Sequence, residues 1–169
     1  MAQQQLSNLQ DSLNRLLRGE HKILLDQGLV VPLPETILRL IDNQKTPAVE
    51  KLLEQIQLAS RSVDKDIRPA ASSCLVTIAA SLAQAQHWDI LAKSAASLKT
   101  IAGSPAYPEE LRAAAAKAVQ MAQARQSILA KAETAPQKPK DPLTLREEQI
   151  FQLAAKGNKE VAKKQLFDL

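Results

Sequence analysis

The sequence has few of the residues that sheets, disulfides and most enzyme sites need. Aromatic side chains make up only 2% of the 169 residues, and the chain has 4 glycines, 2 histidines and 1 cysteine. Strands favour aromatic and β-branched residues, whereas Ala and Leu, which dominate here, favour helices. One cysteine cannot form an internal disulfide, and glycines this far apart cannot build a phosphate-binding loop. The composition therefore predicts an all-α protein without a nucleotide-binding loop.

The chain also lacks a long apolar run and a strong excess of one charge. No run approaches the roughly 18 residues that a membrane-spanning helix needs, and the first residues lack the basic and apolar regions of a signal peptide. The formal net charge is only +4, from 22 basic and 18 acidic side chains spread along the sequence. We therefore expect a cytoplasmic protein that does not enter a membrane. A protein partner is favoured over nucleic acid.

What the sequence does contain is a succession of amphipathic helical patterns. Apolar residues recur every three or four positions, which is the spacing of one helix face. A short helix fits residues 20–27, and Pro32 and Pro34 predict a connector without regular structure after it. The longer predicted helices cover residues 3–18, 35–43, 46–59, 66–85, 88–102 and 108–132.

Two helix starts carry side chains suited to cap free backbone amide groups. Thr46 precedes Pro47 and is predicted to be an N-cap, with the proline as first helical residue. Asp64 or Asp66 is predicted to cap the next helix, in which Pro69 falls in the first turn. Connections this short make successive helices antiparallel.

An internal repeat links the two longest helical patterns. Asp66-Ile67-Arg68-Pro69-Ala70-Ala71 matches Glu110-Leu111-Arg112-Ala113-Ala114-Ala115 in character at an offset of 44 residues, and Leu75 falls on Val119. This pattern resembles the HEAT and armadillo-like helical repeats over about residues 46–132. The resemblance implies stacked antiparallel helical hairpins, closely packed alanines, and Arg68 and Arg112 paired with nearby acidic side chains. Residues 3–43 are then a divergent first repeat or a cap.

A proline-rich segment divides the chain. Residues 133–142 contain three prolines among Lys, Gln and Thr, with almost nothing to bury, and predict an extended linker. The sequence thus predicts a helical-repeat domain over residues 1–132 and an amphipathic helical hairpin over residues 143–169. A capping box of Thr144 and Glu147 starts this hairpin, and Gly157 marks its turn.

The predicted C-terminal hairpin carries more apolar surface than two short helices can cover. Phe151, Leu153, Leu166 and Phe167 are candidate partner-docking residues, which we expect to contact the helical domain, a second copy of the chain or a continuation of it. Residues 143–162 also resemble the opening of a LuxR-type helix-turn-helix domain. That resemblance implies a scaffold helix and a positioning helix, with a base-reading helix to follow.

No residues have the spacing of a metal or catalytic site. His21 and His87 are isolated, and Cys74 lacks a CxxC partner and is predicted to be a small core residue. Trp88 is predicted to pack one helical pair against the next, the alternative being an anchor for a partner. No cofactor or metal is expected.

These patterns predict a non-enzymatic protein–protein interaction or scaffold module built on helical repeats. Its partner would be another protein or a second copy of the chain. The alternative is the N-terminal part of a bacterial-type transcriptional or signalling regulator, whose helical domain senses or dimerises. Salt-sensitive DNA binding would favour the regulator, and a defined protein partner would favour the scaffold.

Overall fold

A computed structural model describes the backbone of residues 2–134 and the side chains of residues 7–132. The described residues include helices and no strand, so the all-α prediction is confirmed. The chain forms two compact units, Met1–Ile128 and Leu129–Leu169. Of the predicted linker, residues 133 and 134 end the last described helix; the rest of the linker and the predicted hairpin over residues 143–169 lie outside the described residues.

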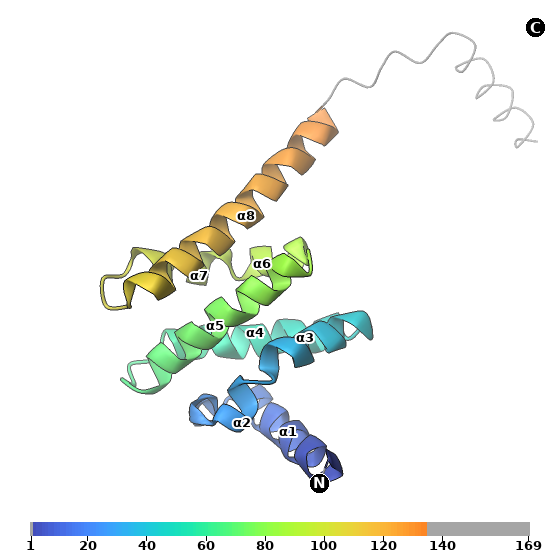
Figure 1. The fold of residues 1–169 in the computed structure, drawn as a ribbon, viewed down its shortest axis with the longest axis vertical. Helices are drawn as coiled ribbons and strands as arrows, with labels where there is room; N and C mark the ends of the chain where they lie inside the picture. Colours follow the sequence, from blue (N-terminus) through green and yellow to red (C-terminus); the bar gives the residue numbers. More distant parts are fainter. Residues whose placement is uncertain (1, 135–169) are drawn as a thin grey trace, which may run out of the picture. The chain divides into compact units, whose positions relative to one another are not determined.

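Short helices account for most of the first unit (Figure 1). No helix among the described residues has both the length and the apolar character needed to cross a membrane. The elements are α1 (Ala2–Leu17), the 3-10 helix η1 (His21–Leu25), α2 (Gln27–Val30), α3 (Leu33–Asp42), α4 (Thr46–Ser60), α5 (Ile67–Gln84), α6 (Trp88–Lys93), α7 (Ala95–Gly103) and α8 (Glu109–Thr134).

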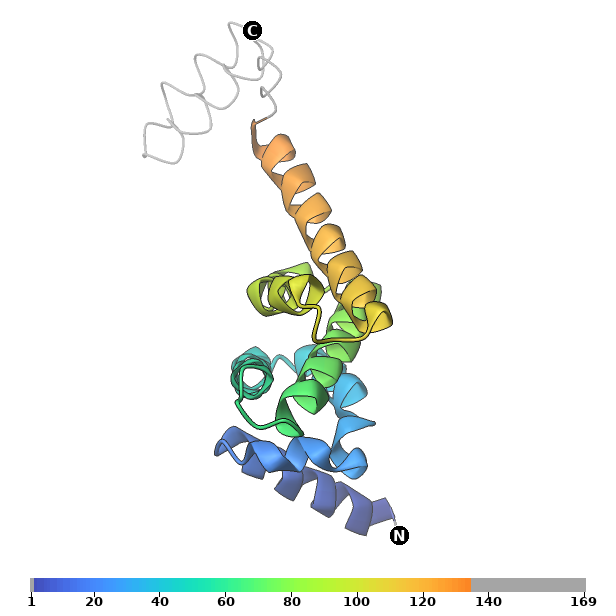
Figure 2. The ribbon, with the colours of Figure 1, turned by 90° about the vertical axis from the view of Figure 1, so that its left-hand side faces the viewer.

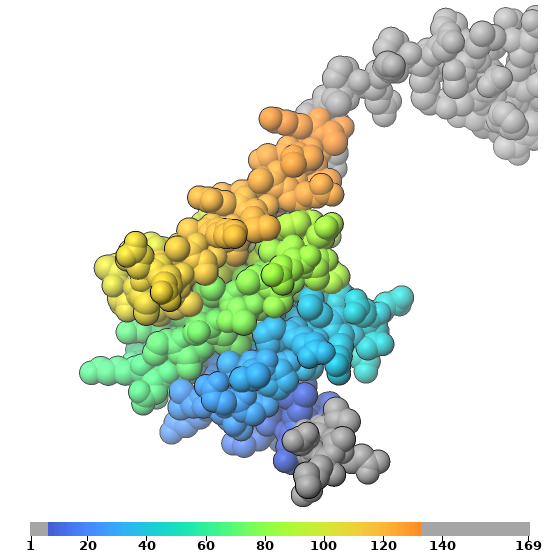
Figure 3. Space-filling model, viewed as in Figure 1, coloured from blue at the N-terminus to red at the C-terminus, as the bar shows by residue number. Residues whose placement is uncertain are grey.

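Within Met1–Ile128, the helices after α2 lie in two layers, with α4, α6 and α7 in one and α3, α5 and α8 in the other (Figures 1 and 2). The most extensive contact joins α4 and α5, and α5 also packs against α3, η1, α6 and α7. The space-filling view shows α8 along one side of α5 and α3 along the other (Figure 3). Helix α5 is therefore the centre of the unit.

One continuous core runs through the layers. Its buried side chains come from every helix between α1 and α8 and pack as a single cluster, against which Trp88 and Tyr107 lie partly buried. Each fully buried leucine or isoleucine contributes about 1.5–3 kcal/mol to folding. The largest fully buried side chains are Leu16, Leu24, Leu29, Leu33, Ile37, Leu52, Leu53, Ile56, Leu75, Ile78, Leu82 and Leu91.

The start of α5 is capped by a carboxylate three residues before the helix. The Oδ1 atom of Asp64 accepts hydrogen bonds from the backbone N–H groups of Asp66 at 2.9 Å and Ile67 at 3.1 Å. These bonds hold the pKa of Asp64 below its usual value, because they favour the charged form. Of the two predicted caps, Asp64 is therefore the one that acts, since the Asp66 side chain makes no cap hydrogen bond.

The predicted N-cap of α4 is wrong. Thr46 is the first helical residue and Pro47 the second, while Lys45 occupies the cap position without a side-chain hydrogen bond. The reason lies in the turn from α3, where Gln44 adopts a φ of 59° and the Lys45 N–H donates to the Leu40 carbonyl at 2.8 Å. This tight turn starts the helix one residue earlier than the proline signal suggests.

The predicted connector around the two prolines is shorter than expected. Helix α2 covers Gln27–Val30, and α3 already begins at Leu33, so that Pro34 is its second residue. A proline in the first helical turn loses no hydrogen bond, because the N–H groups there have no partner within the helix. Only Val31 and Pro32 separate the two helices.

The predicted helix over residues 88–102 is broken in two. Ser94 separates α6 from α7, and its backbone N–H donates to the Leu91 carbonyl at 3.0 Å, three residues back. Its side chain is buried and accepts a hydrogen bond from Gln57 Nε2 of α4 at 3.4 Å. A tertiary hydrogen bond therefore accompanies a break that the apolar periodicity does not show.

The two helices of the predicted repeat bury corresponding positions. Four buried residues of α5 are each followed, 44 residues later, by a buried residue of α8. These pairs are Ala71 and Ala115, Cys74 and Ala118, Leu75 and Val119, and Ile78 and Ala122. The sequence match therefore extends to the face that each helix turns toward its neighbours.

Candidate functional site

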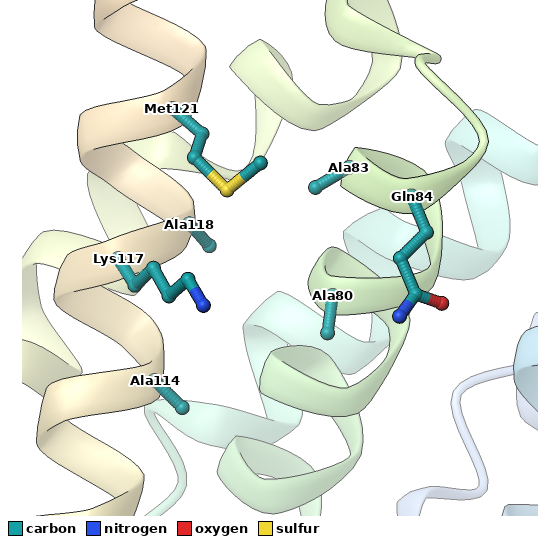
Figure 4. A pocket seen from close by; sticks show the side chains of 7 residues that line it. All are labelled: Ala80, Ala83, Gln84, Ala114, Lys117, Ala118 and Met121. Atoms are coloured by element: carbon teal, nitrogen blue, oxygen red, sulfur yellow. The ribbon is translucent and has the colours of Figure 1, made fainter.

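An open groove lies between α5 and α8, with a cavity volume of ≈ 300 Å³ (Figure 4). Four of its seven lining residues are alanines, and a lysine, a glutamine and a methionine complete it. The lining residues are Ala80, Ala83 and Gln84 of α5 and Ala114, Lys117, Ala118 and Met121 of α8. Both helices therefore contribute to one hollow within the first unit.

The groove exists because small side chains face each other across the two helices. Ala83 and Ala118 are buried, whereas Ala80 and Ala114 are exposed beside them. Methyl groups cannot fill the space between the two backbones, which larger core residues fill elsewhere in the unit. Met121, whose side chain is 38% exposed, extends from α8 toward α5. The result is an accessible apolar surface about two helical turns long.

The charged group at this surface is cationic. Lys117 is exposed, lies over the groove from α8, and takes part in no ion pair among the described residues (Figure 4). The lining contains no carboxylate, histidine or thiol. The groove therefore offers a mostly apolar surface with one positive group beside it.

A second polar cluster ties α4 to α7. Ser97 Oγ donates to Gln57 Oε1 at 3.2 Å, and Arg61 Nη2 donates to Ser97 Oγ at 3.3 Å. With the bond from Gln57 to Ser94, these contacts satisfy two buried hydroxyl groups. The cluster therefore fixes the packing of two helices, and it contains no carboxylate, histidine or thiol.

The connection before α8 is also anchored to α5. The hydroxyl groups of Ser72 and Tyr107 lie 2.8 Å apart, and Ser72 is fully buried. Nearby in the sequence, the Nε atom of Arg112 is buried without a hydrogen-bond partner. Tyr107 thus ties the segment before α8 to α5.

The ion pairs expected for Arg68 and Arg112 do not form within the part of the chain that the structure describes. Near Arg68, the carboxylate of Asp64 is already engaged with backbone N–H groups. Trp88 is half-buried and packs against the core; that it locks one helical pair onto the next stays a prediction.

Cys74 has the environment of a core residue. Its thiol is buried, and burial raises the pKa to about 12, so that it is protonated near neutral pH. His21 lies on a different surface, with Nε2 3.0 Å from Gln55 Oε1. Among residues 2–134, no group of three or more His, Cys, Asp or Glu side chains could hold a metal ion.

The predicted docking residues Phe151, Leu153, Leu166 and Phe167 lie outside the described residues. The groove was not predicted from the sequence, where the alanines of α8 indicate only high helix propensity. Whether they fill a contact or leave a hollow depends on their distance from α5, some thirty residues earlier in the chain. The sequence feature that could have indicated the groove is the pair Lys117 and Met121, which lie one turn apart in an alanine-rich helix.

Comparison of the chain with protein-family models, with curated proteins and with solved structures found no match. The groove between α5 and α8 is therefore the strongest basis for a functional proposal.

Proposed function

We propose that this helical domain is a non-enzymatic protein-interaction module, built on two HEAT-like hairpins, whose groove between α5 and α8 receives a helical segment of another protein. The observation that carries the proposal is the open, alanine-lined hollow of ≈ 300 Å³. Apolar grooves between helices commonly take the apolar face of an amphipathic helix, with anchors at i, i+3, i+4 and i+7.

The shape of the lining favours a helix as occupant. Alanines allow two helix backbones to approach closely, near the lower end of the usual 8–10 Å between helix axes. The groove length of about two turns accommodates two or three anchor side chains of such a helix. A strand would need the exposed edge of a sheet, and no strand occurs among the described residues.

The stacked arrangement supports a scaffold role as well. Helical-repeat proteins bind partners on surfaces created between successive helices, while each helix keeps its core face buried. Here α4 with α5, and α6 and α7 with α8, are the candidate repeats, and their second helices bury matching positions. The groove lies between these two second helices.

Site-specific photo-crosslinking in the source cells tests the proposal. A photoreactive residue replaces the exposed Ala80 in the groove, and a control chain carries it at the exposed Ser73, outside the groove. We expect a discrete adduct from position 80 and none from position 73. The adduct should disappear when Ala114→Leu fills the groove.

The matched control is Ala113→Leu, an equal substitution at an exposed position of α8 that does not line the groove. Leucine and alanine are both good helix formers, so that neither change should disturb α8. An adduct that survives Ala114→Leu, or that is lost equally in Ala113→Leu, would contradict a docking role for the groove.

A further inference from the structure

We infer that the helix received by the groove is acidic: an amphipathic segment of another protein with apolar residues such as leucine and alanine along its seam and carboxylates on its flanks. This inference rests on the proposed function and adds the chemical class of the partner. It is carried by the distribution of charge over α5 and α8, which is independent of the shape of the groove.

The stretches of the two helices that line the groove carry no negative charge, although α8 begins with Glu109 and Glu110. Helix α5 contains Arg68 and no acidic residue, and residues 111–128 of α8 contain Arg112, Lys117 and Arg125 and no acidic residue. Ala114, Ala118, Met121 and Arg125 recur every three or four residues and therefore share one stripe of α8, which begins at Glu110 in the first turn. A positive charge therefore follows the apolar lining along this stripe.

The first part of the unit, residues 1–66, has a different balance of charge. Residues 1–66 hold nine acidic and eight basic side chains, whereas residues 67–128 hold three acidic and six basic ones. The ion pairs of the described residues join Arg15 to Glu20, Arg39 to Glu35 and Lys93 to Glu50, so that each uses a carboxylate of the first part. The net charge is therefore −1 over residues 1–66 and +3 over residues 67–128, which include α5 and the first part of α8.

This charge favours an acidic occupant over the alternatives. A second copy of the chain that docked groove against groove would bring the same cations against Lys117 and Arg125, and like charges repel at an interface. A nucleic acid would meet a hollow whose lining is mostly methyl groups and a methionine, rather than a row of phosphate-binding groups. An acidic helix satisfies both features, since its apolar seam covers the alanines and its flanks face the cations.

The probes are three synthetic helical peptides of about 18 residues, long enough to form several turns. The first has leucine and alanine at i, i+3, i+4 and i+7 and glutamate on both flanks. The second has glutamine in place of every glutamate. The third has the composition of the first in a scrambled order that breaks the apolar stripe.

Binding is measured by fluorescence anisotropy with the full chain and four variants. Ala114→Leu fills the groove, and Ala113→Leu is its matched control. Lys117→Glu reverses the charge over the groove, and Lys99→Glu reverses an exposed lysine of α7. Circular dichroism and the urea midpoint of each variant confirm that the fold is retained.

We expect the acidic peptide to bind the wild-type chain about tenfold more tightly than either comparison peptide. Ala114→Leu and Lys117→Glu should each weaken this binding about tenfold, while Ala113→Leu and Lys99→Glu leave it within about twofold. Raising the salt from about 0.1 M to about 1 M shortens the screening length from about 10 Å to about 3 Å and should reduce the preference for glutamate.

Two outcomes separate the inference from the proposed function. If the glutamine peptide binds as well as the acidic one, or if Lys117→Glu has no effect, the inference of an acidic partner is wrong. The docking role of the groove is then still supported if Ala114→Leu abolishes binding. If Ala114→Leu and Ala113→Leu bind the acidic peptide equally, the groove itself is not the site. Dimers of the wild-type chain that Ala114→Leu dissociates would assign the groove to a second copy and overturn the inference.

Discussion

Helices α5 and α8 share a repeated sequence pattern but lie in different surroundings. On α5, a second stripe of Ser72, Val76, Ala79 and Ala83 is buried in addition to the stripe that both helices bury. The residues 44 positions later on α8 are Ala116, Gln120, Gln123 and Ser127, of which the last three are exposed. Similar sequences thus form an interior helix with two buried stripes and an outer helix with one.

The polar stripe of α8 is compatible with water. Gln120, Gln123 and Ser127 are exposed along it. The apolar groove lies on another stripe of the same helix, to which Ala114, Ala118 and Met121 belong. We therefore propose the groove, and not this polar face, as the surface for a partner.

The largest expected change in stability concerns the stripe that both helices bury, at the corresponding positions Leu75 of α5 and Val119 of α8. Leu75→Ala removes a side chain that is 0% exposed between the layers and should lower the free energy of unfolding by about 3–4 kcal/mol. Val119→Ala, the corresponding change in α8, removes fewer atoms at a position that is 6% exposed, and should cost about 1–2 kcal/mol. Urea unfolding of the full chain measures both. Equal losses would mean that α5 is no more central than α8.

The next largest effect is expected when the residue types at corresponding positions of the second stripe, Val76 of α5 and Gln120 of α8, are exchanged. Val76→Gln places an amide in a buried position of α5 and should lower stability by about 2–4 kcal/mol, from lost apolar burial and an unsatisfied polar group. Gln120→Val on the exposed face of α8 should change stability by less than about 0.5 kcal/mol. Urea midpoints test the pair. A large loss from Gln120→Val would show that this face of α8 is covered.

A smaller effect concerns the start of α5 and depends on pH. In the folded chain, the pKa of Asp64 lies below its ordinary value of 3.8. The charged form is therefore stabilised by folding and contributes stability above pH 3.8. That contribution is lost as the pH falls through the folded-state pKa. Asp64→Ala should therefore lower the urea midpoint near neutral pH, with the difference from wild type shrinking in acid. A difference independent of pH would contradict the carboxylate cap.

The last comparison moves the thiol from α5 to α8 and measures its reactivity. Of the four comparisons, it is expected to change stability least. Cys74 of α5 is buried with a pKa raised to about 12, and should react with a disulfide reagent only after unfolding. In Cys74→Ala, Ala114→Cys, the thiol stands on α8 at an exposed position that lines the open groove. It should react in the native state, as followed by absorbance. Equal protection of both thiols would mean that the groove is closed.

The sequence predicts the helices well where the apolar period is strong. The starts of α5 and α8 to within one residue, and a cap at Asp64 or Asp66, follow from spacing and local hydrogen bonding. The break at Ser94 and the lost cap at Thr46 do not, because each depends on contacts beyond the local sequence: a hydrogen bond from Gln57 and a left-handed turn at Gln44. The groove was missed for the same reason. It depends on how closely α5 and α8 pack, which their compositions leave open.

Localising the acidic peptide on the full chain tests the central claim most directly. In a titration of the wild-type chain followed by backbone amide NMR signals, we predict that the peptide shifts mainly the signals of residues 80–84 of α5 and 114–121 of α8. In the Ala114→Leu variant, the peptide should leave the signals of these residues unchanged. Shifts centred elsewhere, for instance on the exposed Val31 or Val63, or equal shifts in wild type and Ala114→Leu, would contradict the assignment of this groove as the docking site.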